Sequence, residues 1–223
     1  MQPVLEPLAE TQIAYENELA RKLIHVCSIS IPIIYYHISQ ELALLLLAPM
    51  FLGFFAVDLL KMFVKPLARW YYRTFGSMLR THELDESRHS FNGATYVTLA
   101  ALLSVWFFPK MITIAVFSIL ILSDTAAALV GRKFGKHKIA SKTLEGSIAF
   151  FAVAVLVVLQ TPKLNFGIGV ATAVVATLVE LYPIKVFGLA LDDNLTIPLV
   201  AGLFALLCYM FFLPQELAYI SVR

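Results

Sequence analysis

Hydrophobic residues in this chain form long runs that are separated by short polar segments. Runs of this length are typical of helices that cross a bilayer. Several lie near the lower length limit for a crossing, so tilting or partial re-entry is an alternative for the weaker ones. The pattern predicts one domain over residues 1–223, an all-α polytopic membrane protein with about seven transmembrane helices. The predicted spans are His25–Ile38, Glu41–Leu60, Gly93–Phe108, Met111–Gly131, Gly146–Gln160, Gly167–Leu181 and Leu195–Leu213.

Two polar segments have a helical pattern without being apolar throughout. Residues 10–24 predict a short helix that leads into the first span. Residues 61–84 predict an amphipathic helix at the membrane surface, where basic side chains would meet anionic headgroups. A plain anchor without chemistry is the alternative for this second segment. Its basic residues are Lys61, Lys65, Arg69 and Arg73, and its aromatic ones are Trp70, Tyr71, Tyr72 and Phe75.

Composition supports a membrane protein and limits its other features. The 223 residues are 60% hydrophobic and 14% charged, far less charged than a soluble domain. The first eighteen residues are acidic and lack a basic region, so we expect no cleaved signal peptide. Cys27 and Cys208 both lie in apolar spans, and their number and spacing fit neither a disulfide framework nor a zinc site. We expect no nucleic-acid partner, and the oligomeric state is left open.

The distribution of basic residues predicts the orientation. With seven spans, the N-terminus shares one side of the membrane with the loops at 61–92, 132–145 and 182–194. That side carries 14 of the 17 lysines and arginines. Lys110, Lys163 and Arg223 lie on the other side. Positive residues concentrate on the cytoplasmic side, so every motif discussed below is expected to face the cytoplasm.

Asp124 lies inside the fourth predicted span, about 10 Å from its cytoplasmic end. A carboxylate buried in lipid is costly unless something binds it, so such acids are usually functional. Asp124, Ala128 and Gly131 share one helix face. A structural ion pair with another helix is the alternative.

The segment after Asp124 is rich in glycine and lysine. Gly131 and Gly135 would allow unusual backbone conformations, so that amides could face phosphate oxygens. The residue order of a P-loop is missing. Ordinary cytoplasmic charge is the alternative, but Asp124 and the following Lys142-Thr143-Leu144-Glu145-Gly146 favour a polyphosphate site. The basic residues are Arg132, Lys133, Lys136, Lys138 and Lys142.

Further polar residues precede other spans. Asp192 and Asp193, followed by Asn194, offer oxygen ligands that suit Mg²⁺, although a helix cap is the alternative. Asp58 and Glu180 lie near the cytoplasmic ends of their spans. His89 and Asn92 precede the third span, and Glu18, Arg21, Lys22 and His25 share one face of the first helix.

Taken together, these stretches resemble the CTP-dependent lipid kinase family, which includes dolichol kinase, phytol kinase and fungal diacylglycerol kinase. The resemblance covers nearly the whole chain after residue 17. Residues 18–25 resemble the E-x-x-R-K-x-x-H start of the family, and 123–135 with 142–147 resemble its nucleotide loop. Residues 88–93 and 108–110 look most like the diacylglycerol kinase branch. Residues 180–184 and 191–198 are more similar to phytol and polyprenol kinases, so the branch signals disagree.

The resemblance implies transfer of the γ-phosphoryl group of CTP to the hydroxyl of a membrane lipid alcohol. Diacylglycerol is the first choice and a polyprenol or phytol-like alcohol the second. Catalytic roles are assigned to Asp124, Asp58 and Lys142. Either Asp124 or Asp58 would orient the lipid hydroxyl, and the choice between them is left open. Mg²⁺ is assigned to Asp124, Asp192 and Asp193, with Glu145 as a further candidate. CTP is assigned to Gly131, Arg132, Lys133, Gly135, Lys136, Lys138, Thr143, Arg21, Lys22, His89 and Asn92.

Two other functions compete with this one. The loop also resembles that of phosphatidate cytidylyltransferase, which uses CTP and Mg²⁺ to make CDP-diacylglycerol. The C-terminal signature of that enzyme, built around Gly-Gly and Asp-Arg-x-x-Asp, is missing here, which favours phosphoryl transfer. A transporter is the non-enzymatic alternative, but it would need acids near the midplane rather than at one end.

Overall fold

The fold is taken from a computed structural model, which describes residues 15–76, 79, 91–139, 142–186 and 189–221. Six of its helices coincide with predicted spans to within a few residues, and the all-α class is confirmed. Of the described helices, three are long and apolar enough to cross a membrane: α3 (Gln40–Phe63), α7 (Lys110–Phe134) and α10 (Asp193–Phe212). Shorter apolar helices are α6 (Gly93–Phe107), α8 (Leu144–Gln160) and α9 (Phe166–Leu181). The total of seven crossings stays a prediction.

The first predicted span is divided into two helices. Helix α1 (Tyr15–Cys27) covers residues 15–24 of the predicted leader helix and enters the span, and α2 (Ser30–His37) completes it. Residues 10–14 of the leader lie outside the described part. Pro32 lies in the first turn of α2, where its missing N–H cannot continue the hydrogen-bond ladder of α1. Residues 28–29 therefore form a turn, and α1 and α2 are two helices instead of one.

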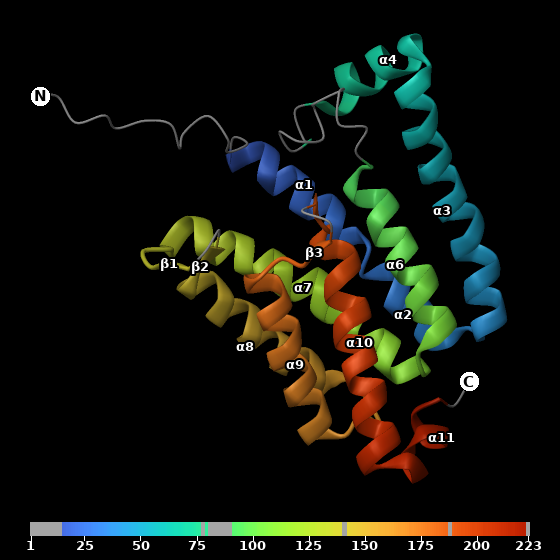
Figure 1. The fold of residues 1–223 in the computed structure, drawn as a ribbon, viewed down its shortest axis with the longest axis vertical. Helices are drawn as coiled ribbons and strands as arrows, with labels where there is room; N and C mark the ends of the chain where they lie inside the picture. The colour runs from blue at the N-terminus through green and yellow to red at the C-terminus, as the bar shows by residue number, and fades with distance from the viewer. Residues whose placement is uncertain (1–14, 77–78, 80–90, 140–141, 187–188, 222–223) are drawn as a thin grey trace, which may run out of the picture.

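The predicted amphipathic segment begins inside a longer helix. Helix α3 continues to Phe63, and Val64 adopts an extended conformation before α4 (Lys65–Phe75) starts. Pro66 explains the break, because it lacks the N–H that would bond to the Met62 carbonyl if α3 continued, whereas the first turn of a new helix tolerates a proline. Helix α4 turns away from α3 and lies across the end of the bundle (Figure 1). Residues 77–78 and 80–84 of the predicted helix lie outside the described part.

Polar caps set the first residue of five of the described helices. At one end of the bundle Asn92, Thr143 and Asp192 cap α6, α8 and α10 by accepting backbone N–H groups at 2.9–3.2 Å. Ser39 and Asn165 do the same for α3 and α9 at the other end. These side chains satisfy amides that a helix start would otherwise leave unpaired. The caps therefore align three helix N-termini at the end where the charged residues gather.

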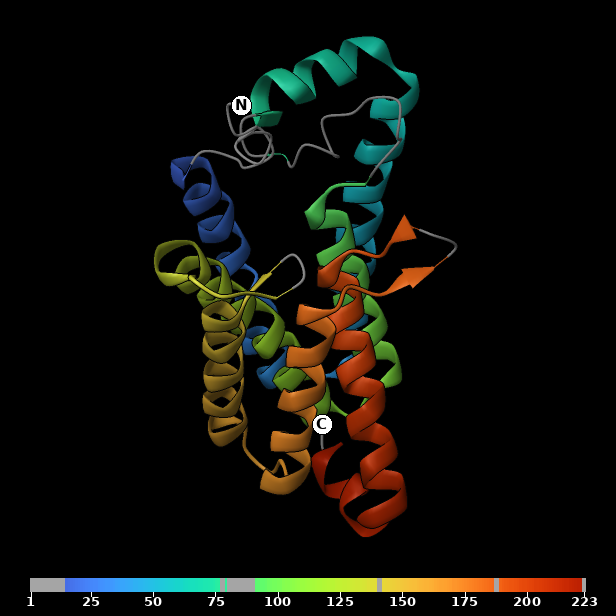
Figure 2. The same ribbon diagram turned by 60° about the vertical axis from the view of Figure 1, so that its left-hand side comes forward.

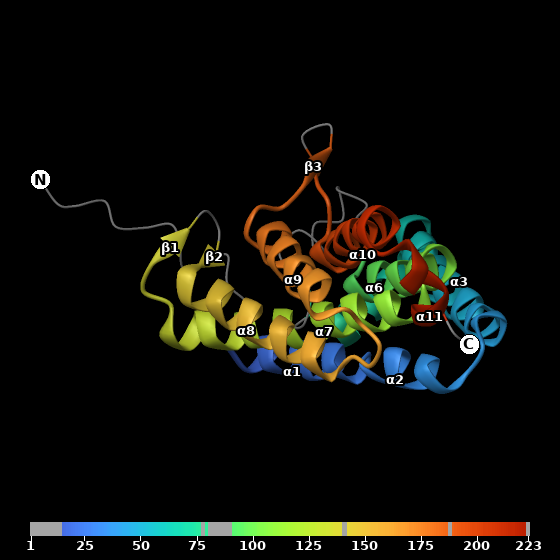
Figure 3. The same ribbon diagram turned by 90° about the horizontal axis from the view of Figure 1, so that it is seen from below.

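Helix α7 is the centre of the bundle. In its most apolar window 61% of the residues are buried, against 17% in α3, which leaves the outer face of α3 for lipid. Helices α1, α2, α8 and α10 all contact α7. Seen along the bundle, α1 and α2 line one edge beside α7 and α8, while α3 and α6 lie away from the first hairpin (Figure 3). Chain segments far apart in sequence thus meet around α7.

Two short β-hairpins lie at the same end of the bundle and were not predicted. Strand β1 (Lys138–Ile139) pairs antiparallel with β2 (Lys142–Thr143), with Lys138 opposite Thr143. Strand β3 (Lys185–Val186) pairs with β4 (Leu189–Ala190). Figure 2 shows both hairpins above the upper ends of α8, α9 and α10, with α4 beyond them. A 3₁₀ turn, η3 (Pro214–Glu216), and α11 (Leu217–Ile220) close the opposite end.

Candidate functional site

Lys142 lies at the centre of a charged cluster at the hairpin end of the bundle. The ammonium group, on β2, is 2.9 Å from Glu180 Oε1 and 3.1 Å from Asp193 Oδ2. Glu180 lies in the last turn of α9 and is only 2% exposed, whereas Asp193 begins α10. Ser147, on α8, donates its hydroxyl to Glu180 Oε2 at 3.4 Å. Three helices and a hairpin therefore converge on one lysine, and we call these residues the Lys142 cluster.

Asp124 is held by α1. The Lys22 ammonium, itself buried, forms an ion pair with the Asp124 carboxylate and also donates to the Asp124 backbone carbonyl at 3.3 Å. His25 Nε2 lies 3.8 Å from Asp124 Oδ2, and Arg21 is half-buried one residue before Lys22. The ion pair with another helix therefore exists, and it brings the first helix to the same end as the Lys142 cluster.

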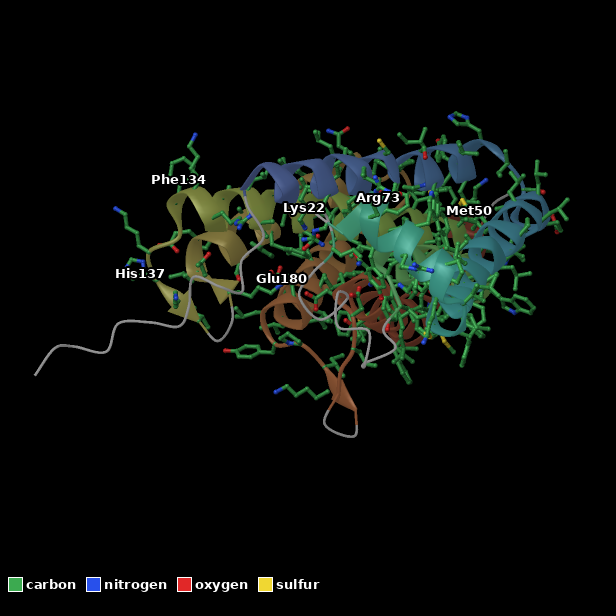
Figure 4. All side chains as sticks on the ribbon, turned by 90° about the horizontal axis from the view of Figure 1, so that it is seen from above. Lys22, Met50, Arg73, Phe134, His137 and Glu180 are labelled. Carbon is green, nitrogen blue, oxygen red and sulfur yellow. The ribbon has the colours of Figure 1, made fainter. Side chains whose placement is uncertain are left out.

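The two groups of charges form one electrostatic unit. Burial lowers the pKa of Lys142, but the carboxylates of Asp193, Glu180 and Asp124 outweigh it and hold that pKa above its ordinary value. Figure 4 views this end directly, with Lys22 and Glu180 both near the middle of the view and His137 at the periphery. Acids and lysines from α1, α7, α9, α10 and β2 thus share one small region.

The other basic residues of the predicted loop lie around this region rather than in it. Helix α7 does not end at Gly131 but continues to Phe134, so Arg132 and Lys133 belong to its last turn. Lys133 is 5.4 Å from the centre of the Phe134 ring. Lys136 and Lys138 are exposed. Lys133, Lys136 and Lys138 therefore present positive charge on the surface near the first hairpin, whereas Arg132 is half-buried.

The glycines pack helices together instead of supplying unusual backbone conformations, which corrects the expectation for Gly131 and Gly135. A Cβ at Gly131 would lie 2.8 Å from Thr143 Oγ1, and one at Gly135 would lie 2.7 Å from Thr143 Cγ2. At Gly146 it would approach the Ala127 carbonyl at 3.0 Å. Small residues let membrane helices approach closely. The contact of α7 with α8 therefore depends on these positions, with the capping residue Thr143 between them.

Asp58 belongs to a separate buried network. It is fully buried, and Lys61 Nζ lies 2.6 Å from its Oδ1. The Asn92 backbone N–H donates to Asp58 Oδ2 at 2.8 Å, its side chain donates to Oδ1 at 3.0 Å, and the Thr95 hydroxyl donates to Oδ2 at 2.6 Å. Both carboxylate oxygens are therefore occupied by donors from α3 and α6. Asn92 takes part in this network as well as capping α6.

The four predicted metal ligands do not form one cluster. Among the described residues, no group of three or more His, Cys, Asp or Glu side chains has metal-binding geometry. Glu145 turns outward to the His137 ring at 2.8 Å, and its own backbone amide and this ring lower its pKa to about 2. Asp192 caps α10. Asp124 and Asp193 are the two predicted ligands that lie at the charged cluster.

Sequence reasoning gave Glu180 no role, yet it is the most buried acid in the cluster. Its position near the predicted cytoplasmic end of an apolar span, like that of Asp124, was the available signal. His89 lies outside the described residues. Gly93 connects the two networks, since a Cβ there would lie 3.5 Å from Asn194 Nδ2, next to Asp193. The Asp58 network therefore borders the Lys142 cluster.

Fold and site together define an all-helical protein with membrane-length apolar helices and a carboxylate–lysine centre at one end. The chain is 31% identical over 219 residues to CTP-dependent diacylglycerol kinase 1 of Saccharomyces cerevisiae, covering 85% of this chain and 72% of that protein. It is 30% identical over 157 residues to the Schizosaccharomyces pombe protein of that name, covering 66% and 68%. An uncharacterized protein of Rickettsia prowazekii, RP860, is 28% identical over 190 residues, covering 83% and 91%.

No family model and no solved structure matches the chain. The relatives nevertheless match it over most of its length. The chain therefore belongs to the family of CTP-dependent lipid kinases.

Proposed function

We propose that this protein transfers the γ-phosphoryl group of CTP to the hydroxyl of a membrane lipid alcohol, with diacylglycerol as the first acceptor and a polyprenol or phytol-like alcohol second. One observation supports it above all. Carboxylates from α7, α9 and α10 meet two lysines, Lys22 and Lys142, at one end of an apolar bundle. A lipid whose chains lie in the bilayer can reach such a site with its polar end.

Lys142 is the group proposed to bind the phosphates. Phosphoryl transfer spreads negative charge over the oxygens of the transferred group, so catalysis depends on positioning and on fixed positive charge. The Lys142 side chain is 27% exposed and can be reached by a phosphate, in contrast to the buried Glu180 side chain that pairs with it. The exposed Lys133, Lys136 and Lys138 would attract the triphosphate from solvent before it reaches Lys142.

Asp124 is the better of the two candidates for the carboxylate that orients the lipid hydroxyl. Donors fill both oxygens of Asp58, which is 0% exposed. The side chain of Asp124 is 14% exposed and lies at the charged cluster. In the proposed reaction the lipid hydroxyl, oriented by a hydrogen bond to Asp124, attacks the γ-phosphorus with its oxygen. The bond to the β-γ bridging oxygen breaks, and the hydroxyl proton leaves on an oxygen of the transferred phosphoryl group. The products are a lipid phosphate and CDP.

The residues present suit a bound magnesium ion. Mg²⁺ prefers carboxylate oxygens and is often held by one or two of them together with substrate phosphates. Asp124 and Asp193 would hold it, since both lie at the cluster and both are partly exposed. When bound, the ion would neutralise charge on the phosphate oxygens.

The test uses purified protein in detergent micelles or vesicles with Mg²⁺. Each γ-labelled nucleoside triphosphate is offered with diacylglycerol, a polyprenol and phytol in turn, and labelled lipid is counted. We expect label in lipid with CTP and diacylglycerol, and none with the Asp124→Asn variant. Wild-type protein that labels none of these lipids with any nucleotide would overturn the proposal.

A further inference from the structure

Helix α4 presents a row of basic side chains that the proposed reaction does not use. Lys65, Arg69 and Arg73 follow one another at a spacing of four residues, so they lie on one face of the helix. All three are exposed. Within the described residues, none of them forms an ion pair or a hydrogen bond. Arg73 lies on the end of the bundle seen in Figure 4, the same end as Lys22 and Glu180.

The opposite face of α4 is apolar and only partly covered by protein. Ala68 and Tyr71 are buried against the bundle, whereas Trp70 is 55% exposed. A basic face, an apolar face and an exposed tryptophan between them are the features of a helix that lies in the headgroup region of a bilayer. The positive charge of the row complements anionic headgroups, with each basic residue changing headgroup affinity by roughly fivefold.

Tyr71 connects this helix to the site. Its hydroxyl accepts a hydrogen bond from Asn92 Nδ2 at 3.0 Å, and the Lys61 ammonium lies 4.5 Å from the centre of its ring. Asn92 caps α6, and the next residue, Gly93, packs beside Asn194 in the first turn of α10. A displacement of α4 would therefore be felt at the helix start that carries Asp193.

We propose that Lys65, Arg69 and Arg73 form a binding surface for anionic phospholipid headgroups of the surrounding bilayer. We further propose that headgroup binding, through Tyr71 and Asn92, holds the start of α6 against α10 and raises the reaction rate. The second part rests on the proposed kinase function, while the first does not. Product lipid phosphate, being anionic, belongs to the same class of ligand.

The first experiment measures headgroup contact without using activity. The chain has two tryptophans, Trp70 and Trp106, so Trp106→Phe leaves a single reporter on α4. The protein is placed in vesicles of neutral phosphatidylcholine or of phosphatidylcholine with phosphatidylglycerol, both with brominated chains. We expect stronger quenching of Trp70 in the anionic vesicles and loss of that difference in high salt.

Charge variants identify the surface. In the same background, Arg69→Gln with Arg73→Gln should remove the dependence of quenching on anionic lipid. The matched control is Lys185→Gln, which changes an exposed lysine of the β3–β4 hairpin at the same end. This variant should keep the dependence of quenching on anionic lipid. Equal quenching of wild-type Trp70 in neutral and anionic vesicles would overturn the proposal that these residues bind anionic headgroups.

The second experiment measures the rate of lipid phosphorylation in the same vesicles. We expect the wild-type rate to rise with the anionic fraction, and the arginine variant to stay at its neutral-vesicle rate. Tyr71→Phe, which removes the acceptor for Asn92, should keep the quenching response and lose the rise in rate. A rate that ignores anionic lipid while quenching responds would overturn the coupling alone. If no lipid is phosphorylated under any condition, the kinase proposal fails, and the quenching result still decides the surface.

Discussion

Replacing Lys142 by methionine is the most informative perturbation of the cluster. The change removes one positive charge from between two carboxylates and shortens the unbranched side chain by one atom. The Glu180 side chain, 3% exposed, then holds a buried negative charge without its closest cation. Removing one partner of a buried ion pair costs about 3–5 kcal/mol. Because the Lys142 side chain is 27% exposed, we expect the lower end of that range, about 3 kcal/mol of unfolding free energy.

The same substitution should also remove a phosphate ligand. The loss of one fixed charge or donor to a transferring group lowers kcat by about 10²–10³-fold. Stability alone could lower the measured activity, so the double variant Lys142→Met with Glu180→Gln is the necessary control. Neutralising Glu180 removes the unpaired buried charge, and most of the lost stability should return. The activity should stay low, because the phosphate still lacks its lysine.

Two measurements on each variant separate these effects. Chemical unfolding in detergent gives the change in unfolding free energy, and label transfer from γ-labelled CTP gives kcat and KM. The reasoning is wrong if the double variant regains both stability and near wild-type activity. Lys142 would then only hold α9 and α10 together.

Four further outcomes follow from the structure. Asp124→Asn should lower kcat by at least about a hundredfold while the protein stays folded and extractable; a wild-type rate would remove Asp124 from the site. Gly146→Ala should cost about 1–3 kcal/mol of unfolding free energy, because its Cβ would lie 2.9 Å from Thr143 Oγ1, whereas Gly53→Ala, with nothing within 4 Å, should be neutral. Asp58→Asn should lower the unfolding free energy by more than the free energy that corresponds to its increase in the KM for CTP. A denaturant titration and a CTP titration would measure the two changes. The pKa of Glu145 is lowered to about 2, so the stabilising contact of its carboxylate is complete above about pH 4.5 and is lost as the pH falls through 2. The difference in unfolding midpoint between wild type and Glu145→Gln should therefore be constant from pH 7 to 5 and vanish towards pH 2.

The hydrophobic pattern located the helices well because apolar runs and helix lengths obey the same physical limits. A run such as Gly167–Leu181 has one favourable structure in a bilayer, a helix, and α9 follows it to within one residue. Helix ends were less predictable. The polar turn after Gly131 looked like a loop, but the close approach of α7 to α8 extends the helix to Phe134.

The partners of the charged residues could not be predicted. Lys142 and Glu180 are 38 positions apart in sequence, and nothing local indicates that they meet. The same is true of Lys22 and Asp124. The glycines carried a signal that was interpreted differently, since Gly131 and Gly135 have the four-residue spacing typical of closely packed membrane helices. Two-residue strands are too short for a period-2 pattern, so the hairpins left no trace.

The central claim is that the terminal phosphoryl group, and not the cytidylyl group, reaches the lipid. CTP labelled with different isotopes at the α- and γ-phosphates tests it directly when incubated with the protein, Mg²⁺ and either diacylglycerol or phosphatidate. We predict that the γ-label enters diacylglycerol and the α-label stays in CDP. Transfer of the α-label into phosphatidate, with release of pyrophosphate, would contradict the account and indicate a cytidylyltransferase.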